Sequence, residues 1–211
     1  MPREPHRGAS NDMRAFALDF VASRMEGFKK DIDICLTGVP SKRRNKKTHA
    51  YFPALSACCG TLEYLTALHR GTTNATGWRQ IVNWSNTFLP QPDYCEDTVR
   101  ILFEAFRHSV AHRGIASGIW NDRRPGDGHG RRITWKIFAD SKRPACALIE
   151  ENGILKNDPP WPCNYSHRMH IHLLAFSMDL LAGPNLYRNQ LESDDQLVAK
   201  FESCMKRLYP D

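Results

Sequence analysis

The stretch FRHSVAHRG, residues 106–114, places two histidines and two arginines at the end of an apolar pattern typical of a helix. A guanidinium binds a phosphate through two parallel hydrogen bonds, and an imidazole moves protons near neutral pH. Arg107, His108 and His112 are therefore residue types suited to phosphate-ester chemistry. At 100° per residue, Arg107 and His112 border one polar arc of a helix. The small Ala111 lies between them, which leaves room for a shallow cationic groove.

Two other interpretations of these residues remain open. Cations in the last turn stabilise the C-terminal end of a helix dipole by about 0.3–1 kcal/mol each, and Gly114 then serves as an ordinary capping glycine. His108 and His112, four residues apart, can also share a metal ion. A third ligand would have to come from elsewhere, for example from the histidines of SHRMHIH at 166–172, and no glutamate follows His108 as in zinc proteases. We therefore predict no metal site and no cofactor.

The composition is that of an ordinary globular protein. The length of 211 residues favours a single domain, 1–211, and 41% of the residues are apolar. No apolar run approaches the roughly 18 residues of a membrane helix, and the N-terminus lacks the apolar core of a secretion signal. Seven cysteines without a CxxC pattern predict reduced thiols. We expect a cytoplasmic protein without a membrane partner.

The basic balance of the chain favours polyanionic partners, because the formal net charge is +6. The densest basic cluster, SKRRNKKTH at 41–49, contains five cations: Lys42, Arg43, Arg44, Lys46 and Lys47. One interpretation is a loop that attracts phosphates. The other is a solvated connector, since runs of charge usually just face water.

Helical spacing of apolar residues organises most of the chain after residues 1–11, which show no periodicity and are expected to form a disordered tail. A glycine or proline follows most of these apolar runs, as expected where a helix ends. The predicted helices cover about residues 11–37, 51–69, 78–88, 93–113, 166–182 and 194–208.

A different pattern separates the last two helices from the rest. Residues 131–138, RRITWKIF, alternate apolar and polar types as a strand does, and Asn152-Gly153 is a strong signal for a hairpin turn. The sequence therefore predicts a mainly α fold. It is a bundle of five or six helices, with a loop and a small antiparallel β-hairpin inserted at about 115–160 before the last two helices.

The motif RHSVAH, Arg107 to His112, resembles that of the HEPN superfamily (higher eukaryotes and prokaryotes nucleotide-binding). That motif is an Arg and a His four to six residues apart, near the end of a late helix in an all-α bundle. A polar residue, here His108, usually follows the Arg. The run FRHSVAHRG also looks like a stretch found in uncharacterised bacterial members, although the β insert is not part of the minimal bundle.

The resemblance implies a metal-independent endoribonuclease that works as a homodimer, with the Arg–His helices of two copies facing each other across a cleft. By this resemblance His112 is the general acid/base, Arg107 holds the scissile phosphate, and His108 orients the substrate. Some members are toxins, which leaves room for an antitoxin partner. Others have no demonstrated cleavage, so the alternative is a catalytically silent module that binds nucleotides or proteins. A third hypothesis is a structural protein, in which the Arg–His pair only ties the helix end to a neighbouring loop.

RNA as the substrate would give further residues a role. The cluster at 41–49, together with Arg113 and Arg131-Arg132, would hold the backbone by charge. Tryptophan rings would stack on bases, and the candidates are Trp78, Trp84 and Trp120.

Overall fold

A computed structural model describes residues 7–37, 39–40, 47–48, 50–74, 77–107, 118–124, 130–155 and 161–210. Of residues 7–11, 39–40 and 47–48 it describes only the backbone.

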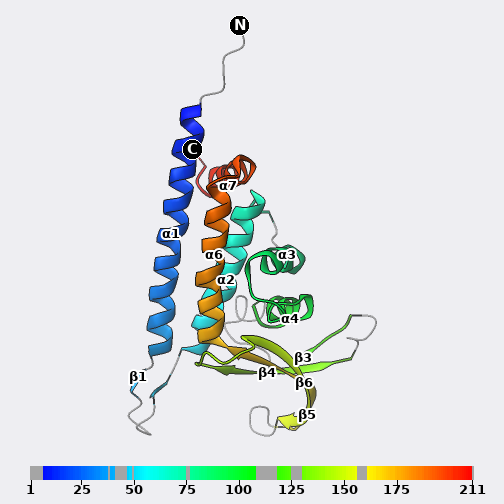
Figure 1. Cartoon of the computed structure of the whole chain (residues 1–211). Coiled ribbons are helices and arrows are strands. Elements are labelled where there is room, and N and C mark those ends of the chain that lie inside the picture. Colours follow the sequence, from blue (N-terminus) through cyan, green and yellow to red (C-terminus); the bar gives the residue numbers. More distant parts are fainter. Residues whose placement is uncertain are drawn as a thin grey trace.

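Helices make up most of the described chain, and the long ones stand side by side above a small sheet (Figure 1). The sequence-based helices at 51–69, 78–88 and 194–208 are confirmed nearly to the residue, whereas the first helix begins four residues before its expected start. The helices are α1 (Arg7–Thr37), α2 (Tyr51–Arg70), α3 (Trp78–Phe88), α4 (Glu96–Ile101), α6 (Leu173–Leu191) and α7 (Asp195–Leu208). A π-helical segment, η1 (Leu102–Arg107), continues α4 directly.

The strands form two sheets of different size. Their bounds are β1 (Val39–Pro40), β2 (Lys47–Thr48), β3 (Trp120–Asn121), β4 (Arg132–Phe138), β5 (Cys146–Leu155) and β6 (Cys163–His172). β1 and β2 pair with each other, and the larger sheet has the order β3-β4-β6-β5. β4 runs parallel to β6, while the other pairs are antiparallel. A small β element is present as predicted, but it is a mixed sheet of four strands and not the predicted antiparallel hairpin.

Two local signals in this region were misleading. Asn152-Gly153 makes no hairpin turn but lies within β5, at a bulge between Glu150 and Gly153. SHRMHIH does not begin a helix; it forms most of β6, and α6 begins only at Leu173. In both places long-range strand pairing outweighs the local preference of the residues.

The last long helix also continues beyond its expected end. Gly183-Pro184 lies inside α6, which runs on to Leu191. Gly183 is buried against α3, where an added Cβ would come within 3.0 Å of a Leu89 methyl and 3.3 Å of the Trp84 ring. Close packing between α3 and α6 therefore stabilises a helix that proline alone would be expected to end.

One apolar core joins the helices to the sheet. Its large members include Trp84, Phe176 and Phe201, each at most 1% exposed, and the sheet contributes Ile133 and Ile171. In the described part of the chain, no helix combines the length and the apolar character that crossing a membrane would need.

Candidate functional site

Arg107 ends the π-helical segment η1 and contacts a carboxylate from another helix. Its Nη2 donates to Glu63 Oε2 of α2 at 2.7 Å. The two side chains are 36% and 28% exposed, so the pair lies at the surface of the molecule. Among the described residues, Glu63 is the one ion-pair partner of Arg107. This contact uses one terminal nitrogen of a guanidinium that carries five N–H donors.

Aromatic packing fixes the backbone next to Arg107. The Phe106 ring is buried and stacks on Phe52, with ring centroids 5.9 Å apart. The edge of the Trp135 ring from β4 meets Phe106 at 5.5 Å. Because both neighbours are rigid rings from other elements, Phe106 has little freedom to turn. The Cα position of Arg107 is therefore set by packing, and its long side chain reaches out to Glu63.

The π-helical geometry changes the angular relations expected from the sequence. A wheel of 100° per residue places Glu104 and Arg107 in one polar arc. In the structure Glu104 instead accepts from Arg100 at 2.7 Å, while Arg107 contacts α2. A π-turn holds more residues than an α-turn, so positions after Leu102 rotate away from their α-helical places.

Most of the other motif residues lie outside the described part of the chain. This holds for His108, His112 and Arg113, and for four of the five cations predicted to attract phosphate: Lys42, Arg43, Arg44 and Lys46. For Lys47 only the backbone is described, in β2. The structure therefore places Arg107 and leaves the Arg–His pair as a prediction.

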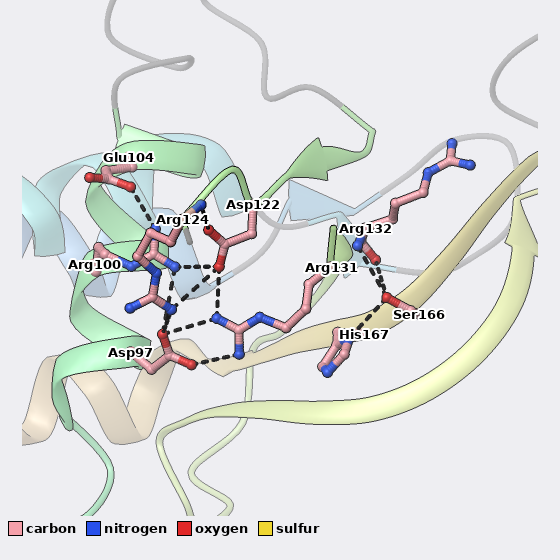
Figure 2. Close-up of polar contacts among 9 residues, drawn as sticks. All are labelled: Asp97, Arg100, Glu104, Asp122, Arg124, Arg131, Arg132, Ser166 and His167. Carbon is pink, nitrogen blue, oxygen red and sulfur yellow. Dashed lines mark hydrogen bonds and ion pairs between the residues drawn. The ribbon is translucent and has the colours of Figure 1, made fainter. Parts of the chain in front are cut away.

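A network of charges, buried at its centre, lies along the earlier turns of the same helix (Figure 2). Arg100, 1% exposed, donates to Asp122 at 2.6 Å and to Glu104 at 2.7 Å. Arg131 forms two hydrogen bonds with Asp97, at 2.7 and 3.1 Å, and one with Asp122 at 2.7 Å. We call this set the acid–arginine network; its members are Asp97, Arg100, Glu104, Asp122, Arg124 and Arg131.

The network is electrically balanced, with three carboxylates and three guanidiniums. Burial raises the pKa of Asp122, but hydrogen bonds from Arg131 and Arg124 outweigh burial and hold that pKa at about 2. Burial also raises the pKa of Asp97, but the hydrogen bonds and positive charges of Arg131 and Arg124 together outweigh burial and lower that pKa. Both acids are therefore ionised at neutral pH and hold the buried arginines in place.

The acid–arginine network anchors the chain that returns after the motif. Arg100 lies over the Trp120 ring, 5.2 Å from its centroid, and Asp122 follows directly after β3. Thr134 of β4 donates its hydroxyl to the Gly118 carbonyl oxygen at 2.9 Å. The segment that contains His108 and His112 therefore runs between two fixed ends, Arg107 and Gly118.

Several residues predicted to contact RNA have other roles in the structure. Arg131 is engaged in the acid–arginine network and is a poor candidate for phosphate binding. Trp84 is 1% exposed and belongs to the core, and Trp120 packs under Arg100. Trp78 is half-buried, with the guanidinium of Arg79 over its ring.

The histidines of SHRMHIH take separate environments along β6. His167 borders a cleft of about 410 Å³ together with Asp97 and Arg131, and its Nδ1 contacts Ser166 Oγ at 2.9 Å. Burial first, and then the charge of Arg131, lower the pKa of His167. His172 pairs with Asp140. Within the described residues, no group of three or more His, Cys, Asp or Glu side chains is arranged to hold a metal ion.

Glu63 and Asp122 were not foreseen from the sequence. They contact arginines 44 and 22 residues away, and no local pattern shows such a pairing. The contact between Arg100 and Glu104 could have been predicted from the sequence, because residues four apart face each other on a helix. No family model matches the chain, and no similar curated protein or solved structure was found.

Proposed function

We propose that the chain is a HEPN-like, metal-independent endoribonuclease in which Arg107 and His112 act on a phosphodiester of RNA. The observation that supports this best is the position of Arg107. Its guanidinium lies at the surface, one terminal nitrogen contacts a carboxylate, and His112 follows five residues later in the chain. A site that holds one carboxylate by a charge-assisted hydrogen bond also suits a phosphate oxygen.

The proposed reaction uses the ribose 2′-hydroxyl as an internal nucleophile. The 2′-oxygen forms a bond to phosphorus while the bond to the 5′-oxygen breaks, which yields a 2′,3′-cyclic phosphate and a free 5′-hydroxyl. His112 transfers the proton of the 2′-hydroxyl or the proton needed by the leaving oxygen, and His108 orients the substrate. Arg107 offsets the negative charge that grows on the phosphoryl oxygens. As the resemblance implies, two copies of the chain would form the cleft.

The test is cleavage of single-stranded RNA by the purified chain in EDTA. His112→Ala and Arg107→Ala should each reduce the rate at least about 100-fold, the range expected for a lost proton-transfer group. Arg79→Ala removes an exposed arginine on α3 and should cut like the parent. Mass spectrometry should find the cyclic phosphate end. Cleavage by both Ala variants at the parent's rate, with the fold intact by circular dichroism, would show that the proposal is wrong.

A second candidate is a catalytically silent module that binds nucleotides or proteins. The contact that favours it is the same Glu63 carboxylate, which already offsets the charge of Arg107. This candidate predicts salt-dependent RNA binding without any product. Glu63→Gln tests under either candidate whether an RNA phosphate contacts Arg107, because it removes the competing charge. A surface pair contributes about 0.2–1 kcal/mol, so RNA affinity should rise by up to about fivefold if phosphate replaces Glu63.

A further inference from the structure

The four-stranded sheet has a face turned away from the helical core. Figure 1 shows α2, α4 and α6 gathered on one side of this sheet. Ile133 of β4 and Ile171 of β6 are fully buried on that side. Because side chains alternate along a strand, the neighbouring positions point the other way. We call the opposite side the outer face; its members on β4 and β6 include Arg132, Lys136, Phe138, Arg168, His170 and His172, and the register places the exposed Ile149 and Ile154 of β5 on it as well.

Register and electrostatics agree that these side chains lie together. Lys136 is paired with His170, and Phe138 with His172, in the parallel ladder between β4 and β6. Burial lowers the pKa of His170; the charge of Glu151 raises it in part, and the positive charges of Arg168 and Lys136 lower it. His170 therefore adds a neutral ring to the outer face at neutral pH, while the surrounding residues add charge.

Positively charged side chains outnumber negatively charged ones on the outer face. Arg132 and Lys136 are exposed, and neither forms an ion pair within the described part of the chain. Figure 2 shows the Arg132 guanidinium extending away from its neighbours. Arg168 pairs with Glu151 at 3.0 Å, and His172 pairs with Asp140. The acids that reach this face are thus already paired, which leaves Arg132 and Lys136 as unbalanced positive charges.

Aromatic rings lie beside these charges. Phe138 stacks on His172 with centroids 4.6 Å apart and planes 9° apart, and it meets the edge of His170 at 5.4 Å. The Lys136 ammonium lies 5.1 Å from the centroid of Phe138. The Phe138 ring is half-buried, and an aromatic ring beside cations that can contact phosphates is the combination found in surfaces for single-stranded nucleic acid.

The spacing of the two unbalanced cations fits an extended polyanion. Arg132 and Lys136 are four residues apart on β4, about 13 Å at 3.3 Å per residue, which allows each to contact a different phosphate. We propose that the outer face binds the backbone of single-stranded RNA, with Phe138 as a stacking platform. This proposal rests on RNA being the substrate of the proposed endoribonuclease, and it names the surface that holds the strand.

The test measures binding of a fluorescent 20-nucleotide RNA by anisotropy, in EDTA, with His112→Ala as the common background. Adding Arg132→Glu and Lys136→Glu should weaken binding at least about 10-fold. The same pair should also make the slope of log affinity against log salt shallower by about 1.4, or about 0.7 for each lost phosphate contact. The matched control is Lys29→Glu with Arg79→Glu, which changes the net charge equally at exposed sites on α1 and α3 and should retain most of the affinity.

A milder variant tests stacking on the Phe138 ring without changing the charge of the outer face. Phe138→Leu keeps an apolar side chain but removes the stacking surface, and it should weaken RNA binding about 5-fold or more. Thermal unfolding of each variant shows whether the fold is retained. If the charge reversal unfolds the chain, Arg132→Gln with Lys136→Gln replaces it and should weaken binding at least about 3-fold.

The outcomes separate this proposal from the catalytic one. If the outer-face variants bind RNA as tightly as the parent, or if the control pair loses as much RNA affinity as they do, the proposed binding surface is wrong. Binding to vesicles containing phosphatidylserine without binding to RNA would also overturn it, because the polyanion would then be a membrane. Weakened RNA binding by the outer-face variants, with full cleavage by His112→Ala in the native background, would support the surface and contradict the catalytic proposal.

Discussion

Asp122 is the side chain on which the buried charges of the molecule most depend. It is 1% exposed and accepts hydrogen bonds from three arginines, Arg100, Arg124 and Arg131. A buried guanidinium is tolerated when carboxylates compensate its charge, and it becomes costly once they are removed. Asp122 thus stabilises the fold mainly because its negative charge compensates the buried charge of Arg100, and less through the strength of any single hydrogen bond.

Asp122→Asn should lower the free energy of unfolding by about 3–5 kcal/mol, the range for breaking one side of a buried ion pair. Asparagine keeps the shape of the side chain, so loss of charge is the main change. Urea unfolding followed by circular dichroism measures the effect. Glu26→Gln breaks the exposed pair with Lys30 on α1 and should leave the urea midpoint nearly unchanged.

Asp122→Asn also predicts how the stability of the folded chain depends on pH. The pKa of Asp122 is about 2 in the folded chain, below its ordinary value of 3.8, so between these values the unfolded state binds more protons. The stability contributed by Asp122 is therefore present above pH 3.8 and is lost as pH falls through about 2. The difference in stability between the parent and Asp122→Asn should shrink over this window. A difference that stays constant down to pH 2 would contradict the lowered pKa.

Elements with local patterns were predictable, and elements that depend on distant partners were not. The helix at 78–88 was found at its true bounds because its apolar spacing is a property of eleven consecutive residues. β6 was mistaken for the start of a helix, although Met169 and Ile171 face the core at the spacing of a strand. Its neighbours β4 and β5 come from earlier parts of the chain, and only their pairing makes 163–172 a strand.

In the candidate site, too, the sequence predicts the local features but not the contacts between distant residues. Arg107 could be singled out from its motif, because the types and spacing of RHSVAH are local. Its partner Glu63 belongs to a helix 44 residues earlier, and the contact depends on how η1 packs against α2. The π-helical turn likewise has no signature in the sequence that would have corrected the helical wheel.

Two glycines with the same backbone conformation provide a test of helix packing. Gly71 ends α2 and Gly130 precedes β4, and both have a φ of 78°. An alanine at either position is strained by about 1–2 kcal/mol. At Gly71 the added Cβ would also lie 2.9 Å from the backbone of Lys200 in α7, whereas at Gly130 it meets nothing within 4 Å. Gly71→Ala should therefore destabilise the chain by at least about 1 kcal/mol more than Gly130→Ala in urea unfolding. Equal losses would show that α7 is not held against Gly71.

The distribution of thiols reports on opening of the whole molecule. All seven cysteines are free. Cys58, Cys59, Cys146 and Cys204 are buried, and we call the first three of these the core thiols; Cys95 is exposed. Burial raises the pKa of all three core thiols, that of Cys59 to about 12. Because the thiolate is the reactive form, these groups should stay protected as long as the core is closed.

A disulfide reagent that changes colour when it reacts with thiols should show directly that the buried thiols are protected in the folded chain. In the native protein Cys95 should react first, and Cys95→Ser should remove the fastest phase. The three core thiols should react only at the rate of unfolding, and should become reactive together in urea. Fast reaction of the core thiols without denaturant would show that the core opens far more readily than its packing indicates.

The sheet order has a consequence for how the molecule behaves at high concentration. β5 lies at the margin of the larger sheet and pairs along one side with β6. Its exposed residues include Ile149 and Ile154, which would make a straight strand of ten residues a template for self-association into fibrils. The bulge between Glu150 and Gly153 interrupts the row of outward amide and carbonyl groups midway along that margin. We therefore expect the irregularity at Asn152-Gly153 to hinder neighbouring molecules from adding strands at this margin of the sheet.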